Sequence, residues 1–225
     1  MTLSFTKKKV IAICSSILLI ICLISNHAYA TSDYNKSIEI YVDSHDDYQK
    51  QVSDLMSDGY TDVNVVFTDL NKEDPVASNP PQLKSLGPIK RYYVKNVRKG
   101  SDYIGKSRIA SASGAPGVRL SIKTKKDVST TISATFGASY TAISAAVGWN
   151  VTKTERISVT GSAKVPYKVG KKKVKRGVLS AYPMYKTKKY DVYYGIQNTK
   201  KERKKGTGVT MKPIGTHFKM SYTYK

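Results

Sequence analysis

The chain has 225 residues, of which 40% are hydrophobic and 24% are charged, and its formal net charge at pH 7 is +22. A chain of this length can bury a substantial core, so it does not need disulfide bonds to fold. Its two cysteines, Cys14 and Cys22, both lie in the apolar N-terminal run described next, which excludes disulfide and thiol chemistry from the rest of the protein.

The N-terminus predicts a secretory signal peptide over residues 1–30. Three lysines, Lys7–Lys9, precede an almost unbroken apolar run from Val10 to Ile24. Ala28 and Ala30 then supply the small residues that a signal peptidase recognises. Because the apolar run is too short and wrongly flanked for a membrane span, we expect a secreted, extracellular protein that can associate with a cell surface.

Charge is divided unevenly along the remaining chain. Residues 31–83 carry 11 acidic and 3 basic side chains, whereas residues 84–225 carry 32 basic and 5 acidic ones. A net charge of this size indicates a polyanionic partner. For an exported protein the candidates are anionic lipid or a cell-wall polymer such as teichoic acid, and nucleic acid is the weaker alternative. The remaining alternative is that the charge serves solubility alone.

The first part of the exported chain, residues 31–74, predicts a small acidic α+β unit. The sequence SIEIYV from Ser37 to Val42 is typical of a strand, a helical pattern follows and ends at Gly59, and VNVVFTDL from Val63 to Leu70 predicts a second strand. A stretch rich in Pro, Asn and Ser comes next, and we interpret residues 75–89 as a linker.

After the linker the hydrophobic pattern changes to period two, which predicts a basic antiparallel β domain over residues 90–225. The segment RYYVKNV from Arg91 to Val97 is strand-like, and apolar and polar residues alternate from Val118 to Lys125 and again from Phe218 to the C-terminus. The predicted fold class is therefore mainly β, an antiparallel β-sandwich or extended sheet preceded by the acidic α+β unit.

One stretch of this domain, Val128–Thr152, has no charged residue in 25 positions. Its apolar residues fall on even positions up to Tyr140 and on odd positions from Ile143, so a turn or bulge is needed near residues 140–144. Each half has about the ten residues of a transmembrane β-strand. The stretch is thus a candidate membrane-insertion hairpin, and its key apolar residues are Val128, Ile132, Phe136, Tyr140, Ile143, Val147, Trp149 and Val151.

The same pattern is also typical of an ordinary hairpin in a β-sandwich. Such a hairpin buries one face and pairs Ser and Thr side chains on the other, and Ala and Gly suit close sheet packing. From the sequence alone, both interpretations of the uncharged stretch stay open.

Two clusters of basic residues are candidates for binding an anionic surface, and tyrosines lie between them. Each Lys or Arg near an anionic leaflet contributes about 1 kcal/mol, and Tyr prefers the membrane interface. The same residue types also bind single-stranded nucleic acid, or they form solvated hairpin tips with tyrosines serving as strand formers. The first cluster contains Lys171, Lys172, Lys173, Lys175 and Arg176, and the second contains Lys200, Lys201, Arg203, Lys204 and Lys205.

The catalytic and metal-binding motifs that we tested do not fit. Gly100–Ser107 matches the P-loop pattern, but Ser, Gly and Pro interrupt any helix that would follow it. His45 and His217 have no metal-ligand spacing, and the acidic residues near the first helix lack the spacing of a calcium loop. We therefore expect a non-enzymatic protein with no catalytic residue, no metal and no cofactor.

Residues from about 90 to 225 resemble small secreted β-rich proteins of Gram-positive bacteria. The resemblance lies in the turn at Gly114-Ala115-Pro116-Gly117 and in the Ser/Thr/Ala-rich alternating strands that follow it. The uncharged stretch is also similar in composition to the insertion segments of aerolysin-like β-pore-forming toxins. That second resemblance implies a homo-oligomer that assembles at a membrane and inserts a shared barrel.

Together these features predict a secreted, cationic, non-enzymatic protein that binds anionic bacterial surfaces. Its membrane-permeabilising action would be bacteriocin-like or toxin-like and would use the uncharged stretch. The alternative is a structural or binding protein of the cell wall or matrix, attached electrostatically to teichoic acid or extracellular nucleic acid.

Overall fold

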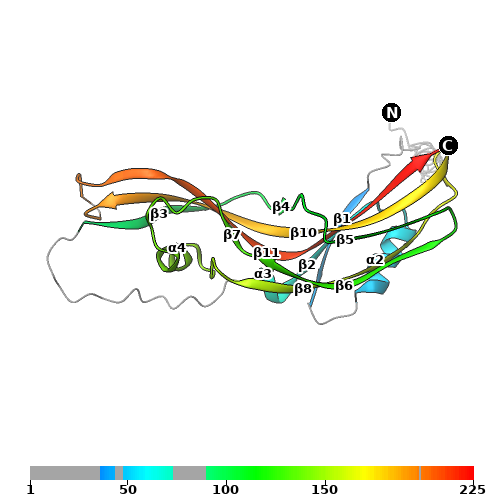
Figure 1. The fold of residues 1–225 in the computed structure, drawn as a ribbon, viewed down its shortest axis with the longest axis horizontal. Coiled ribbons are helices and arrows are strands. Elements are labelled where there is room, and N and C mark those ends of the chain that lie inside the picture. The colour runs from blue at the N-terminus through cyan, green and yellow to red at the C-terminus, as the bar shows by residue number, and fades with distance from the viewer. Residues whose placement is uncertain (1–35, 44–47, 73–89, 198) are drawn as a thin grey trace, which may run out of the picture. The chain divides into compact units, whose positions relative to one another are not determined.

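The computed structural model describes residues 36–43, 48–72, 90–197 and 199–225 (Figure 1). The predicted signal peptide, with Ala28 and Ala30, and the predicted linker lie outside the described residues. Asn35–Lys225 forms one compact unit. This unit is mainly β with few helices, which confirms the predicted fold class.

The main sheet has nine strands built around two very long ones. β10 (Lys172–Gly195) and β11 (Arg203–Tyr224) pair antiparallel along almost their whole length, with three register shifts. At about 3.3 Å per residue, a strand of this length extends for about 75–80 Å. The shorter strands pair along its two sides: β3 (Arg91–Lys99), β4 (Tyr103–Ile104), β5 (Ala110–Gly114) and β9 (Lys168–Val169) with β10, and β2 (Asp62–Phe67) and β7 (Thr131–Ile132) with β11.

The acidic N-terminal segment joins this same sheet. β1 (Ser37–Val42) pairs in parallel with β2, and α2 (Gln49–Ser57) connects them, so the expected strand–helix–strand order is confirmed. β2 ends at Phe67, where the short α3 (Thr68–Asn71) begins. Because β2 also pairs with β11, the acidic segment shares a core with the basic strands, and the shared core includes Val52, Val63, Phe67, Ile157, Leu179 and Phe218.

A second, two-stranded sheet consists of β6 (Arg119–Ser129) and β8 (Thr154–Lys164). The two strands pair antiparallel from one end to the other without a register shift. Alternate residues such as Leu120, Ile122 and Ile157 are buried in the main core, as period-two patterning predicts.

The uncharged stretch does not form the predicted pair of strands. After β6 and the two-residue β7, the chain forms α4 (Tyr140–Val147), which lies near the β3 end of the main sheet (Figure 1). The Ser139 hydroxyl accepts a hydrogen bond from the Ala142 N–H at the start of α4, and Gly148, with φ of 78°, ends the helix.

The prediction of a second strand from residue 143 is wrong for a simple geometric reason. Ile143 and Val147 have the odd spacing of one strand face, but they are also four residues apart and therefore share one helix face. Both are completely buried against Tyr190 and Val192 of β10. Trp149 completes the same cluster, and burial against the sheet accounts for the absence of charge here.

Candidate functional site

The eight predicted insertion residues have two different environments. Phe136 and Tyr140 are exposed, with exposed fractions of 40% and 55%. Ile132 is half-buried and packs against the cluster around Trp149. The other five, Val128, Ile143, Val147, Trp149 and Val151, are buried.

Trp149 is fixed by polar contacts as well as by packing. Its indole N–H donates to the Thr210 hydroxyl of β11 at 3.2 Å, and both residues are fully buried. The Lys188 ammonium lies 4.8 Å from the centre of the indole ring and donates to the Val147 carbonyl at 2.7 Å. Lys188 therefore caps the end of α4 and covers Trp149 at the same time.

The loop before α4 has strained backbone geometry. Phe136 has a φ of 49°, which is rare for a bulky residue, and Gly137 has a φ of 91°. The Phe136 ring lies against Gly206, where a Cβ atom would come within 2.5 Å of it, and the Tyr92 ring covers Gly137 in the same way. Aromatic packing on bare backbone thus holds this loop in an unfavourable conformation.

The two predicted basic clusters do not form one patch. Lys171, Lys172 and Lys173 lie at the turn where β10 begins, whereas residues 199–205 follow the end of β10 and lead into β11. The whole of β10 therefore separates them.

Part of the second cluster is neutralised locally. Lys204 forms an ion pair with Asp191 at 2.9 Å, and Lys205 lies 5.6 Å from the centre of the Tyr194 ring. Lys200, Lys201 and Arg203 are exposed and form no ion pair with any described residue. These three cations are available to an external anion.

Four tyrosines support this end of the sheet. Tyr93 and Tyr193 stack with ring centres 6.0 Å apart, and Tyr92 and Tyr194 pair at 4.7 Å. Burial, together with a hydrogen bond that the Tyr93 hydroxyl donates to Glu202, raises the pKa of Tyr93 to about 12. The Tyr93 hydroxyl therefore stays a protonated donor to Glu202 at neutral pH.

The first cluster is more open. Lys173 and Lys175 are exposed, while Lys172 lies 5.4 Å from the centre of the Tyr224 ring. Arg176 donates to the Ser113 hydroxyl on the neighbouring strand β5. This end of β10 also combines exposed cations with an aromatic ring.

Sequence reasoning missed Asp191, which is only 4% exposed. Its carboxylate accepts hydrogen bonds from Thr207 at 2.6 Å and Asn96 at 3.1 Å, and forms ion pairs with Lys204 and Arg98. The hydrogen bonds from Lys204 and Thr207 hold its pKa well below the usual range, against the effect of burial. The only signal in the sequence is its isolation as one acid in a long basic segment.

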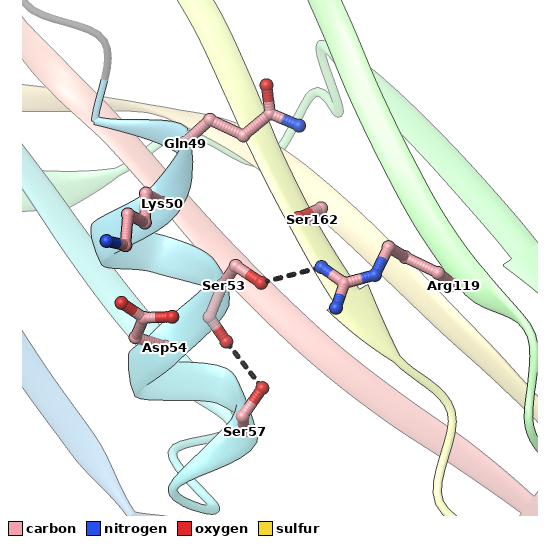
Figure 2. A pocket seen from close by; sticks show the side chains of 7 residues that line it. All are labelled: Gln49, Lys50, Ser53, Asp54, Ser57, Arg119 and Ser162. Atoms are coloured by element: carbon pink, nitrogen blue, oxygen red, sulfur yellow. Dashed lines mark hydrogen bonds between the residues drawn. The ribbon is translucent and has the colours of Figure 1, made fainter.

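Sequence reasoning also missed a polar groove between α2 and the β6–β8 ladder, with a volume of about 350 Å³. Figure 2 shows Gln49, Ser53 and Ser57 on the side of α2 that faces β8, with the Arg119 side chain reaching toward them from β6. Arg119 donates to the Ser53 hydroxyl at 3.0 Å. No periodic pattern marks this groove, because its residues come from three separate elements.

The part of the chain that the structure describes lacks a membrane-spanning helix and a metal-binding cluster. No helix there is long and apolar enough to cross a membrane. No group of three or more His, Cys, Asp or Glu side chains in the same ranges could hold a metal ion.

Comparison with known proteins gives no relative from which a function could be transferred. The sequence matches no protein-family model, and no curated protein is significantly similar to it. The function must therefore be argued from the residues themselves.

Proposed function

We propose that this is a secreted, cationic, non-enzymatic protein that binds anionic bacterial surfaces and permeabilises their membranes with Val128–Thr152. The observation that carries the proposal is the register of the β6–β8 ladder. At its inner end the first two residues of the uncharged stretch, Val128 and Ser129, face Glu155 and Thr154, and the rest of the stretch follows directly.

Continued unchanged, this register would convert the uncharged stretch into a regular hairpin. Ile132 would face Val151, and Tyr140 would face Ile143. Residues 141 and 142 would remain as a two-residue turn, which is the commonest hairpin connection.

The continued ladder would also separate the side chains by polarity. One face would carry only apolar and small residues: Ile132, Ala134, Phe136, Ala138, Tyr140, Ile143, Ala145, Val147, Trp149 and Val151. The opposite face would carry mainly Ser, Thr, Gly and Asn. After Tyr140 the apolar residues change from even to odd positions. The helical form does not require this change, whereas a continuous hairpin does. Each half has the length of a membrane-spanning strand.

The folded form described above would be the soluble, stored state of this segment. Release requires α4 to unfold and Trp149 to leave its site, which disfavours the change in water. The strained backbone at Phe136 reduces this cost, because the strain is lost when the loop becomes extended.

A single inserted hairpin would leave two strand edges unpaired in the hydrocarbon. Such edges are not tolerated in lipid, so several copies have to close into a barrel. The proposed active form is therefore a homo-oligomer assembled at the membrane. The exposed Lys200, Lys201 and Arg203 would concentrate the protein on anionic lipid before assembly.

The experiment ties β7 to the main sheet with a disulfide bond. Thr131 and Met211 are direct partners in the β7–β11 ladder, where Cα atoms lie about 4.5–5.5 Å apart, within the range of a disulfide. The T131C/M211C variant should release no dye from anionic liposomes when oxidised and should regain release when reduced. A matched control, S113C/V178C, joins β5 to β10 and leaves the uncharged stretch free.

Equal dye release by oxidised and reduced T131C/M211C would refute insertion of this segment. Absence of release by the unmodified protein, with salt-sensitive binding retained, would instead support the second candidate function. That candidate is a cell-wall or matrix protein held electrostatically to polyanions. The separation of the two basic clusters along β10 favours this second function, because each end of β10 could bind a different polymer chain.

A further inference from the structure

The polar groove between α2 and the β6–β8 ladder has features of a ligand site. Its volume of about 350 Å³ is near the lower end of the range for small-molecule pockets. Its lining residues include no aromatic side chain, so the groove provides no surface for stacking a sugar ring or a base. Its hydroxyl, amide and guanidinium groups instead suit a small, strongly polar ligand.

Arg119 is the main cationic group of the groove. Within the described residues its guanidinium makes one hydrogen bond, to Ser53, and no ion pair, although a guanidinium carries five N–H donors. Its direct partner across the ladder is Lys164, another cation, so the neighbouring strand does not neutralise it. Arg119 is exposed, so its other N–H donors meet water when no anion is bound and are free to bind one.

Ser162 supplies a second, independent observation. It lines the groove from β8, it is only 2% exposed, and its hydroxyl has no hydrogen-bond partner among the described residues. The Ser162 hydroxyl is not one of the fully buried polar atoms that lack a partner, because it is open to the groove. A hydroxyl in this position can hydrogen-bond to a ligand in the groove.

The first turn of α2 favours the same kind of ligand. Gln49 is its first residue, the turn contains no acidic side chain, and the helix dipole favours negative charge at this end. Lys50 and Asp54 also line the groove, although Figure 2 shows both on the side of α2 away from Arg119. Their charges are opposite, so Arg119 leaves the lining with a net positive charge.

We infer that this groove binds the phosphate ester of a small polyol, with glycerol phosphate as the simplest representative. The Arg119 fork would hold the phosphate oxygens together with the Ser162 hydroxyl. Ser53, Ser57 and Gln49 would bind the polyol hydroxyl groups. The inference rests on the proposed function only for the source of the ligand, since phosphoglycerol occurs both in anionic lipid headgroups and in polymers of the bacterial wall.

The test measures binding of glycerol 1-phosphate to the purified protein by isothermal titration calorimetry. We expect saturable binding that Arg119→Gln weakens at least about tenfold and that Ser162→Ala weakens about three- to tenfold. Lys164→Gln is the matched control, because it removes the same charge from the next strand and should change affinity less than about twofold. Glycerol and acetate serve as probes that lack the phosphate, and both should bind at least about tenfold more weakly.

Three results would overturn the inference: no saturable binding of glycerol 1-phosphate, equal weakening by Lys164→Gln and Arg119→Gln, or equal binding of acetate. If Arg119→Gln does not fold by circular dichroism, Arg119→Lys keeps the charge without the planar fork, and it should still weaken binding several-fold.

The two possible sources are separated by competition. Free glycerol 1-phosphate should displace the protein from phosphatidylglycerol vesicles, and not from phosphatidylserine vesicles, if the lipid headgroup is the source. If the wall polymer is the source, free glycerol 1-phosphate should displace the protein only from poly(glycerol phosphate). Displacement from neither would overturn the inference.

The oxidised T131C/M211C variant distinguishes this inference from the proposed function. It should bind glycerol 1-phosphate as tightly as the unmodified protein even though it releases no dye. Loss of binding in this variant would contradict an independent groove.

Discussion

A lysine at position 145 provides the sharpest test of the two conformations proposed for the uncharged stretch. In the folded protein Ala145 is exposed on α4, so Ala145→Lys should change the free energy of unfolding by only a few tenths of a kcal/mol. In the continued β6–β8 ladder the same position faces Ala138 on the apolar side. One substitution is therefore nearly neutral in one state and unfavourable in the other.

The size of the effect follows from the position of the residue along the strand. Residue 145 would lie about three residues from the middle of its half of the hairpin, or about 7 Å from the bilayer midplane for a strand tilted by about 40°. A lysine facing lipid at this depth costs about 1–2 kcal/mol per copy, which lowers the insertion equilibrium about five- to thirtyfold. The assay is dye release from anionic liposomes as a function of protein concentration.

The control is Thr141→Lys, which adds the same charge to another exposed residue of α4. In the continued ladder this residue would lie in the turn, outside the hydrocarbon, so release should stay close to that of the unmodified protein. Both variants should melt within about 2 °C of the parent. Either of two results would refute the proposed register: unimpaired release by Ala145→Lys, or an equal loss of release in Ala145→Lys and Thr141→Lys, which would indicate a general effect of charge on α4.

Two further predictions concern the folded protein. Asp191→Asn should lower the free energy of unfolding by about 1.5–3 kcal/mol in urea titrations, because the buried carboxylate loses its charged hydrogen bonds while Lys204 and Arg98 stay partly solvated. The folded pKa of Asp191 lies below the unfolded value of 3.8, so its stabilisation is present above pH 3.8 and is lost as the pH falls below it. The variant should therefore lack this acid-sensitive component of stability. Burial lowers the pKa of His217 below 6.5, Asp62 acts in the opposite direction, and Lys219 lowers it by a smaller amount. Stability should therefore fall as the pH drops below 6.5. His217→Gln should make the melting temperature less dependent on pH between pH 7.5 and 5.

The sequence predicts most of the fold because most of its elements have only one way to bury their apolar residues. The strand Ser37–Val42 alternates cleanly, and α2 has helical spacing that ends at a glycine. In each case the local pattern and the tertiary partner agree. The existence and type of these elements could therefore be assigned before any partner was known.

The prediction for the uncharged stretch is wrong because this segment has more than one way to bury its apolar residues. Its small residues, Ala, Ser, Thr and Gly, fit either a helix or a strand, and Ile143 and Val147 satisfy both periodicities. Tertiary contacts select the helix: Trp149 packs on β10 and β11, and Lys188 binds the end of α4. These partners are 39 to 61 residues away along the chain, and no local pattern contains them.

The candidate sites also depend on tertiary contacts that the sequence alone does not show. The basic clusters are obvious in the sequence, but the 24-residue β10 that separates them is not, because its length depends on pairing with β11. The groove at Arg119 and Ser162 depends on how α2 packs against β8. Side chains that gather from three elements become a site only through tertiary structure.

The burial of Trp149 has a kinetic consequence, since it is the only tryptophan in the chain. Detachment of this segment within one molecule is a first-order event, and its rate does not depend on protein concentration. Joining of subunits is of higher order, and its rate rises with concentration. In the proposed mechanism the indole of Trp149 would change surroundings in the first event, so its emission under stopped flow would report the first step separately from the second. Trp149 emission would therefore show whether detachment precedes assembly.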